Sequence, residues 1–325
     1  MINLPELWAR KNFVVMAGSV DRRTVLKGIA ATTFAFATGC ASDDRERSGV
    51  TLPKVDTSTD LQVERFPLGV QAGAMTHESV ILWSYSNDGG GHAFALWPEG
   101  EDPESNAHMA ELTPIDGYLK LRVDGLSPSP WYVYGVVTDD QVWSPLGRVR
   151  TAHGAHEIRP VLVCATACTA AGRAPLPSLD FLADQSLDVF CHRGDMSDND
   201  GATTTTDFRS AWAKTQALPE YQALLSSVGY YQTWDDHEMT DNEMLPNLPP
   251  DILARGIDAY FETTPTDRHE DGHWWTSYRW GRSVEFFVLD CRREREPATR
   301  QYISRASMDW LKSALAESPC HFNVV

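Results

Sequence analysis

Between residues 66 and 151 the hydrophobic positions come in short runs that alternate with polar residues and are separated by turn-forming residues. Three of these runs are at 79–84, 118–123 and 131–137, and no amphipathic helical spacing lies between them. Short alternating runs are typical of strands that turn one face toward a core. The pattern predicts a small β-sandwich over residues 62–152, with its aromatic side chains in the core.

The sequence Leu-Ser-Pro at 126–128, followed by Tyr132 and Tyr134, resembles the signature of fibronectin type III domains. In such sandwiches a tyrosine near the start of a strand locks one corner by a hydrogen bond to the backbone. We therefore expect the sandwich to be fibronectin-III-like.

After residue 156 the hydrophobic pattern changes. Strand-like apolar runs now alternate with stretches of helical spacing, with runs at 161–165, 187–191 and 284–289 and helical stretches at 208–225 and 307–316. This alternation is typical of parallel strands joined by crossover helices, and it predicts that the first two runs are buried strands. The expected fold of residues 157–325 is therefore α/β. A further strand would begin at Phe322, so we expect a chain truncated within this domain.

The first 40 residues have the features of an export signal. Arg22 and Arg23 precede an apolar stretch at 28–37 that is too short to span a bilayer. This arrangement is typical of a twin-arginine signal, which exports proteins that have already folded. We expect export by the twin-arginine machinery to the periplasm or the cell surface.

The signal has two alternative cleavage sites. The sequence Ala-Thr-Gly-Cys at 37–40 resembles a lipobox and would place a lipid anchor on Cys40, whereas Ala-Phe-Ala at 35–37 would serve an ordinary signal peptidase. The polar residues 41–61 are expected to form a flexible tether after cleavage at either site. A membrane contact is expected only through the lipid anchor.

The charge of the chain limits its partners. The formal net charge is −17, and it becomes −20 without residues 1–39, which carry a net charge of +3. A strongly acidic surface disfavours nucleic acid and anionic lipid, so an anionic substrate would need cations in its own site. The six cysteines are irregularly spaced in a long chain and do not indicate a disulfide framework.

Acidic and thiol side chains follow the ends of the predicted strands. Cys168 follows the first run, Asp195 the second, and Asp236 a third that begins at Tyr230. In open α/β sheets the ligand crevice lies at the carboxyl ends of the strands, so these side chains should converge. Like charges in one crevice are unfavourable unless cations occupy it. The sequence therefore predicts a metal site, with further candidates at Asp198, Asp200, Asp235 and His237.

Paired metal ions could activate a bridging hydroxide and neutralise a phosphoryl group during in-line displacement. Asp195 is the best candidate for a carboxylate between two metals, because Gly194 before it allows a tight turn at the strand end. His237, beside the second acidic loop, could protonate the leaving oxygen or hydrogen-bond the phosphoryl oxygens. We expect Asp235 to cap or orient the loop.

These motifs resemble the PhoD-like alkaline phosphatase (alkaline phosphatase D) branch of the calcineurin-like metallophosphatases. The resemblance covers residues 62–325 and rests on short motifs, which are Phe-Pro-Leu-Gly at 66–69, Ala-Cys at 167–168, Gly-Asp at 194–195, Trp-Asp-Asp-His-Glu at 234–238 and Leu-Asp-Cys-Arg at 289–292. It implies a metallophosphatase sandwich, incomplete at its C-terminus, preceded by the N-terminal domain of that family.

The resemblance also implies a binuclear or larger metal centre. Cys168 and Asp195 would bind iron, and Asp195 would bridge to a second metal, calcium in some members, held by Asp236 and Asn242. Asp198 stands where the family usually has a tyrosine ligand, which leaves the identity of the metal open. The family's remaining ligands come from later motifs, so this chain is expected to lack them.

The leading hypothesis is an exported phosphomonoesterase or phosphodiesterase that scavenges phosphate from phosphate esters; the choice between monoester and diester stays open. The alternative is a non-catalytic lipoprotein that binds calcium or a cell-wall polymer. A hydrolase of another class, such as a nuclease, could use the same scaffold, but the acidic surface argues against a polyanionic substrate.

The other cysteines and histidines look structural. Cys164 and Cys191 lie within apolar runs and are expected in the core. Histidines that have no carboxylate cluster nearby in the sequence are expected at the surface, namely His77, His92, His108, His153 and His156.

Overall fold

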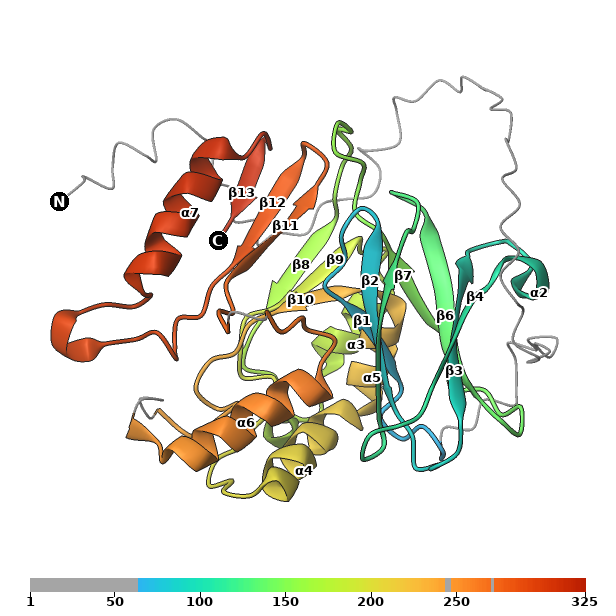
Figure 1. Ribbon diagram of the computed structural model, residues 1–325, viewed down its shortest axis with the longest axis horizontal. Coiled ribbons are helices and arrows are strands. Elements are labelled where there is room, and N and C mark those ends of the chain that lie inside the picture. The colour runs from blue at the N-terminus through green and yellow to red at the C-terminus, as the bar shows by residue number, and fades with distance from the viewer. Residues whose placement is uncertain (1–63, 243–246, 270–271) are drawn as a thin grey trace.

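The computed structural model describes residues 64–242, 247–269 and 272–325 (Figure 1). The predicted export signal, its two alternative cleavage sites with Cys40, and the predicted tether all lie outside the described residues. None of the described helices is both long and apolar enough to cross a bilayer.

The described strands form three sheets. The six-stranded sheet has the order β5 (Tyr118–Asp124), β2 (Ser79–Tyr85), β1 (Val70–Gly73), β10 (Tyr230–Gln232), β9 (Val189–His192) and β8 (Val163–Thr166). The four-stranded sheet has the order β4 (His108–Leu112), β3 (His92–Pro98), β6 (Trp131–Thr138) and β7 (Gly147–Arg150). The three-stranded sheet has the order β11 (Thr276–Trp280), β12 (Val284–Val288) and β13 (Phe322–Val324).

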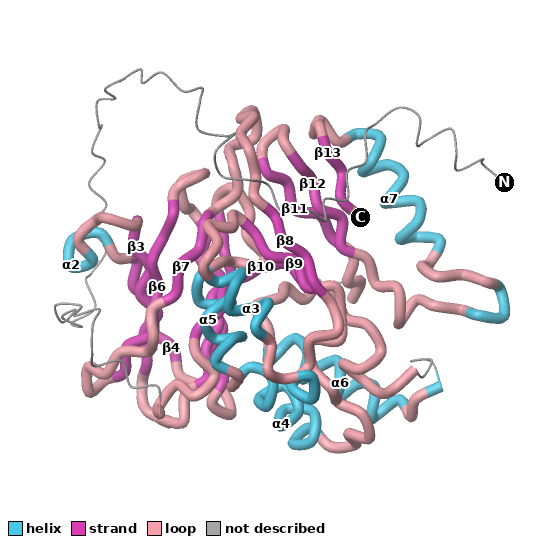
Figure 2. The backbone as a smooth tube through the Cα atoms, turned by 180° about the vertical axis from the view of Figure 1, so that it is seen from behind, coloured by secondary structure: helices cyan, strands magenta, loops and turns pink. Residues whose placement is uncertain are grey.

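The longer helices all follow β8 in the chain. The α-helices are α2 (Pro103–Asn106), α3 (Pro177–Ala183), α4 (Thr205–Gln216), α5 (Pro219–Ser227), α6 (Pro250–Thr263) and α7 (Arg305–Glu317). Short 3-10 helices cover Ala171–Arg173 and Pro297–Thr299. Figure 2 shows α3 and α5 next to each other beside the sheet that contains β9 and β10.

The N-terminal strands form the predicted sandwich. Strands β1, β2 and β5 pack face to face against the four-stranded sheet, and alternate residues such as Leu82 and Phe94 meet in one buried cluster. The backbone N–H of Ser127 donates to the hydroxyl of Tyr132 at 3.0 Å. This is the corner bond expected from the fibronectin-like signature.

One sheet of the sandwich continues into the α/β region. β1 pairs in parallel with β10, with Gly73 opposite Tyr230. A Cβ atom on Gly73 would lie 2.7 Å from the carbonyl oxygen of Pro265 and 3.0 Å from that of Tyr230, so only glycine fits there. The hydrophobic pattern predicts two separate units and does not indicate this shared sheet.

The two faces of β9 and β10 build different cores. Phe190 and Tyr230 pack among the helices, whereas Val189 and Tyr231 face β11 and β12 on the opposite side. Phe287, on the outer face of β12, packs against α7. The alternation of side chains along strands thus produces helix, sheet, sheet and helix layers, which confirms the predicted α/β sandwich.

Two expectations about individual elements were wrong. The single helical stretch expected at 208–225 is divided into α4 and α5, because Pro219 lacks a backbone N–H and begins a new helix. The run at 161–165 is not a buried strand: Leu162 is 52% and Val163 37% exposed. β8 is the edge strand of its sheet, so one side of it has no neighbouring strand to cover it.

Candidate metal centre

The loops that follow β8, β9 and β10 meet at one edge of the six-stranded sheet. The Sγ of Cys168 lies 3.1 Å from Oδ2 of Asp195. One carboxylate oxygen from each of Asp195, Asp235 and Asp236 lies within 4.8 Å of the others. Parallel strands explain this meeting, because their carboxyl ends share an edge.

Three of the sequence-predicted ligands have a left-handed backbone. Their φ angles are +58° for Cys168, +56° for Asp195 and +53° for Asn242. Side chains other than glycine rarely adopt this region, because Cβ then crowds the backbone. Such conformations persist only where the surroundings enforce them, and they concentrate at functional sites.

Gly194 lets the loops after β9 and β10 touch. Its φ is +103°, and a Cβ atom there would lie 2.5 Å from the Cβ of Asp235 and 2.6 Å from its backbone nitrogen. From its place at the predicted strand end, this glycine is expected to permit a tight turn. The structure adds that it permits the close approach of the second acidic loop.

Glu238 ties the two acidic loops together. Its Oε2 accepts the backbone N–H groups of Asp195 at 3.0 Å and Asp235 at 2.8 Å, and its Oε1 accepts that of Met196 at 2.7 Å. The residue is 1% exposed, and burial raises the pKa of its carboxyl to about 7 although the three N–H groups oppose the shift. The side chain of Asn199 adds a further tie by donating to the Glu238 carbonyl at 2.6 Å.

Arg292 supplies a positive charge to the cluster. Its guanidinium pairs with Oδ1 of Asp235 and, at 2.9 Å, with Oδ1 of Asp236. The hydrogen bond to Asp235 raises the pKa of Arg292, so the group stays charged. Oδ1 of the buried Asp290 accepts the Arg292 backbone N–H at 3.2 Å and the Trp234 indole N–H at 3.0 Å, which ties the loop after β10 to the loop after β12.

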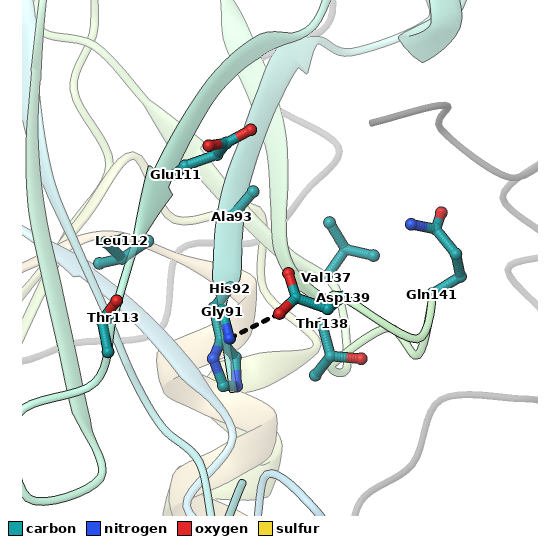
Figure 3. A pocket seen from close by; sticks show the side chains of 10 residues that line it. All are labelled: Gly91, His92, Ala93, Glu111, Leu112, Thr113, Val137, Thr138, Asp139 and Gln141. Atoms are coloured by element: carbon teal, nitrogen blue, oxygen red, sulfur yellow. Dashed lines mark hydrogen bonds between the residues drawn. The ribbon is translucent and has the colours of Figure 1, made fainter. Parts of the chain in front are cut away.

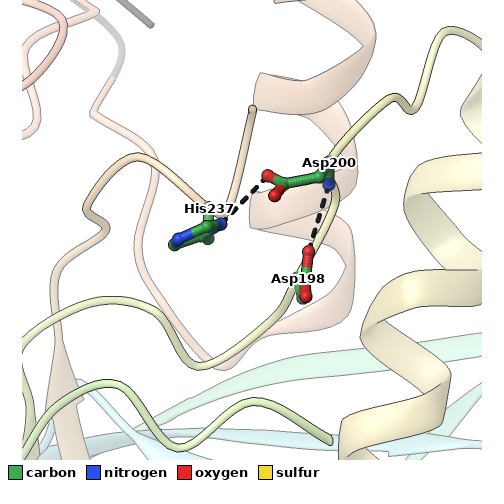
Figure 4. Close-up of side chains that lie close together, drawn as sticks. All are labelled: Asp198, Asp200 and His237. Carbon is green, nitrogen blue, oxygen red and sulfur yellow. Dashed lines mark hydrogen bonds and ion pairs between the residues drawn. The ribbon is translucent and has the colours of Figure 1, made fainter. Parts of the chain in front are cut away.

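His237 lies beside a second acidic group (Figure 4). Its Nδ1 is 3.0 Å from Oδ1 of Asp200, and Asp198 lies in the same group. Burial lowers the pKa of His237, but the hydrogen bond to Asp200 and the neighbouring carboxylates outweigh burial and raise it above the ordinary value. Asp198 is exposed and faces the backbone N–H of Asp200 at 3.4 Å.

Asn242 approaches the cluster through its backbone. Its N–H donates to Oδ2 of Asp236 at 2.7 Å, and its side-chain amide donates to Asp241. The structure therefore brings the six sequence-predicted residues into one continuous region, in which Asp236 and His237 connect the first acidic group to the second.

The donor set fits a cation. Oδ1 of Asp195 is buried and has no hydrogen-bond partner among the described residues. Three carboxylates converge there, and Arg292 pairs with two of them. The hydrogen bond to Asp195 raises the pKa of the Cys168 thiol, so a cation would have to displace that proton to gain a thiolate. An unpaired buried carboxylate oxygen costs free energy that a bound cation would recover.

Sequence reasoning did not assign roles to Glu238 or Arg292. The spacing of Asp235 and Glu238 could have indicated the first, because a Glu that accepts an N–H three residues before it is the arrangement of a helix capping box. No comparable local signal exists for Arg292, whose partners are more than fifty residues away in the sequence.

A separate cavity of about 370 Å³ lies on the four-stranded sheet (Figure 3). Its lining comes from β3, β4 and the end of β6 and includes His92 and Asp139. Both ring nitrogens of His92 have partners, Ser86 Oγ at 2.9 Å and the Gly90 carbonyl at 2.8 Å. His92 and His153 are 3% and 1% exposed, so their expected place at the surface was wrong. His92 is a structural residue.

Comparisons with known proteins agree with this geometry. The PhoD-like phosphatase family matches residues 164–325, and the N-terminal domain of PhoD-like phosphatases matches residues 52–153. No curated protein sequence matches the chain.

Two solved structures share the fold. The structure of PhoD is 18% identical with a TM-score of 0.73, and the match covers 82% of this chain and 62% of that one. The purple acid phosphatase PPD1 from yellow lupin (Lupinus luteus) seeds is 13% identical with a TM-score of 0.52, and the match covers 77% of this chain and 48% of that one. The chain thus spans less than two thirds of the length of either structure.

Proposed function

Because this chain belongs to the PhoD-like phosphatase family, we propose that it is an exported, metal-dependent phosphoester hydrolase that acts on phosphomonoesters or phosphodiesters. One observation carries the proposal. The buried Oδ1 of Asp195 has no hydrogen-bond partner among the described residues, at the point where Cys168 and two further carboxylates converge.

The proposed division of ligands follows the resemblance to PhoD-like alkaline phosphatases. Cys168 and Asp195 would hold one metal, with Asp198 as a further oxygen donor, and Asp195 would bridge to a second metal held by Asp236 and Asn242. We propose iron at the thiolate position, since a thiolate favours a transition metal, and calcium at the position with oxygen donors alone. When bound, these ions would activate water and neutralise the phosphoryl charge.

His237 is the proposed proton donor to the leaving oxygen. Asp200 holds its Nδ1 at 3.0 Å, which fixes the ring and leaves Nε2 for the substrate. Nε2 lies 3.8 Å from Oδ1 of Asp241, which is an ion-pair distance for the protonated ring but beyond hydrogen-bond distance. The raised pKa of His237 favours the protonated form that a general acid requires.

Export is proposed from the sequence pattern. Arg22 and Arg23 before a short apolar stretch favour the twin-arginine route, which would carry a protein that has loaded its metals in the cytoplasm. A lipid anchor on Cys40 would then hold the protein at a membrane surface, with residues 41–61 as a tether.

The test uses the protein reconstituted with iron and calcium and assayed with p-nitrophenyl phosphate and bis(p-nitrophenyl) phosphate. Hydrolysis of at least one ester, lost after chelation and in Asp195→Asn, is the expected result. His237→Gln should lower the rate without releasing metal. A protein that binds both metals and leaves both esters intact would instead favour the non-catalytic, calcium-binding alternative.

A further inference from the structure

We propose that a buried hydrogen-bonded triad of Thr169, His192 and Tyr221 positions Cys168 and Asp195 for metal binding. The inference rests on the metal centre proposed above. It concerns three residues behind the centre that would not touch the metal or the substrate.

The triad joins three elements. Oγ1 of Thr169 lies 2.8 Å from Nε2 of His192 and 2.5 Å from the hydroxyl of Tyr221. The Tyr221 hydroxyl is 3.3 Å from the same His192 nitrogen. Thr169 belongs to the loop after β8, His192 is the last residue of β9, and Tyr221 lies in α5. The contact therefore fixes the start of the ligand loop to a strand and a helix.

All three side chains are buried, so their polar atoms depend on one another. Burial lowers the pKa of His192 to about 3, and the imidazole is neutral at physiological pH. Nδ1 of His192 has no hydrogen-bond partner among the described residues, so the ring interacts through Nε2 alone. With its proton on Nδ1, the neutral ring offers Nε2 as an acceptor. The two hydroxyl protons then suffice for a chain in which Tyr221 donates to Thr169 and Thr169 donates to His192.

The triad is directly connected to the proposed ligands. The backbone N–H of Cys168 donates to the carbonyl of Gly194 at 3.0 Å, and that of Thr169 donates to the carbonyl of Asp195 at 3.0 Å. This pair of bonds holds together two residues, Cys168 and Asp195, whose left-handed backbones are unfavourable on their own.

The chemistry explains why the anchor must lie at Thr169. Cys168 is exposed and cannot be held by packing, whereas the next side chain points into the protein and has a hydroxyl group with two partners. Removing that hydroxyl would leave the Tyr221 hydroxyl and the His192 nitrogen without their shortest bonds and would free the loop to leave the strained conformation. The distance between Sγ of Cys168 and Asp195, 3.1 Å, would then no longer be enforced.

Cobalt(II) is a suitable probe, because a cobalt–thiolate bond gives a charge-transfer absorption that reports ligation by Cys168 itself. Thr169→Val keeps the shape of the side chain and removes the hydroxyl, Thr169→Ser keeps the hydroxyl, and Tyr221→Phe removes one partner. Each full-length variant is titrated with cobalt(II), and its folding is measured by circular dichroism and chemical denaturation. Cys168→Ser is the control for the origin of the absorption.

We expect Thr169→Val to weaken cobalt(II) binding by about tenfold or more and to reduce the charge-transfer band at saturation, as is typical when a group that orients a ligand is lost. Thr169→Ser should restore both toward the wild-type values, and Tyr221→Phe should fall between. Wild-type affinity and band intensity in Thr169→Val would overturn the inference; if that variant does not fold, the same result in Tyr221→Phe would overturn it.

The control separates this inference from the proposed function. If Cys168→Ser keeps the charge-transfer band, or if the wild type shows none, Cys168 is not a ligand and the proposed metal centre itself is wrong. If the band depends on Cys168 but not on the Thr169 hydroxyl, the centre stands and the triad is only structural.

Discussion

An aspartate lies near each end of strand β9, and the two aspartates differ in their hydrogen-bond partners. Asp188 precedes the strand: its Oδ1 pairs with Arg150, and its Oδ2 accepts the backbone N–H of Leu162 at 2.8 Å. Asp195 follows the strand. Its Oδ2 accepts the thiol of Cys168, and its buried Oδ1 has no partner among the described residues.

The difference separates a structural carboxylate from one that we propose binds a metal. Asp188 is a single carboxylate with its own cation and N–H donor, and it joins β7 to the segment before β8. Asp195 lies with Asp235 and Asp236, and Arg292 pairs with those two and not with Asp195. A buried carboxylate oxygen without a partner is costly, and a cation at the proposed site would offset that cost.

The largest expected effect comes from removing the charge of Asp195. Asp195→Asn should abolish cation binding at the centre, with a loss of at least about 10²-fold in affinity, because even groups outside the coordination sphere typically contribute 10- to 100-fold. The metal-free variant should be at least as stable as the wild type, since one of three facing carboxylates becomes neutral. Calorimetric titration and chemical denaturation measure the two effects. A metal-free protein that is strongly destabilised would make Asp195 a second structural carboxylate.

The matched change at the other end of β9 should have the opposite profile. Asp188→Asn leaves the half-buried Arg150 without its counter-charge and should lower the free energy of unfolding by about 3 kcal/mol. Cation affinity should stay within a factor of about 2 of the wild type, since Asp188 is not among the side chains that converge with Asp195. Denaturation curves with and without metal separate these outcomes. Equal loss of cation affinity in both aspartate variants would erase the comparison.

A change at Glu238 tests whether cation binding depends on the hydrogen bonds by which this residue holds the two acidic loops together. Glu238→Gln replaces one carboxylate oxygen by an amide NH2 group. The NH2 group cannot accept hydrogen bonds, so at least one of the three backbone N–H groups loses its acceptor. The expected cost is about 2 kcal/mol of unfolding free energy, together with weaker cation binding, because the loops with Asp195 and Asp235 separate. Glu99→Gln, at an exposed salt bridge to Arg148 on the sandwich, is a control that should change neither quantity appreciably. An unchanged cation affinity in Glu238→Gln would show that the two acidic loops keep their positions without the hydrogen bonds to Glu238.

The smallest effect is a pH dependence that originates at His192. Its pKa is lowered to about 3 in the folded protein, whereas an unfolded chain binds the proton near the ordinary value of about 6.5. The stability from this group is therefore present above pH 6.5 and is lost as pH falls toward 3. The loss should be about 1.4 kcal/mol at pH 5.5 relative to pH 7.5. Glu238 works in the opposite direction, because its pKa is raised.

The difference between wild type and His192→Gln isolates the contribution of His192. The variant should have a flatter decline of stability between pH 7.5 and 5.5 in denaturation experiments. Parallel declines in the two proteins would show that the buried ring is not the source.

The layered fold was largely accessible from the sequence, because strands and helices differ in the period of their apolar positions. The pairing of Gly73 with Tyr230 was not, since it joins distant segments through a short contact that leaves no periodic signal. The exposure of Val163 was missed for a related reason: an apolar run predicts a strand but not its place at the edge of a sheet.

The candidate site could likewise be predicted only in part from the sequence. Asp195 and Asp236 follow strands, and the rule that parallel strands end at one edge was enough to bring them together. The bonds from Glu238 to three backbone N–H groups and the pairing of Arg292 required coordinates, because the geometry of loops depends on tertiary contacts and not on local pattern. The assignment of individual metals stays a prediction.

The most direct test is anomalous diffraction from crystals of the protein soaked with manganese(II), a cation that suits carboxylate ligands. We expect an anomalous peak in contact with the buried Oδ1 of Asp195 and with Asp236, and none at Asp188. A fully soaked crystal with no peak at Asp195 would contradict the central claim that this end of β9 is a metal site.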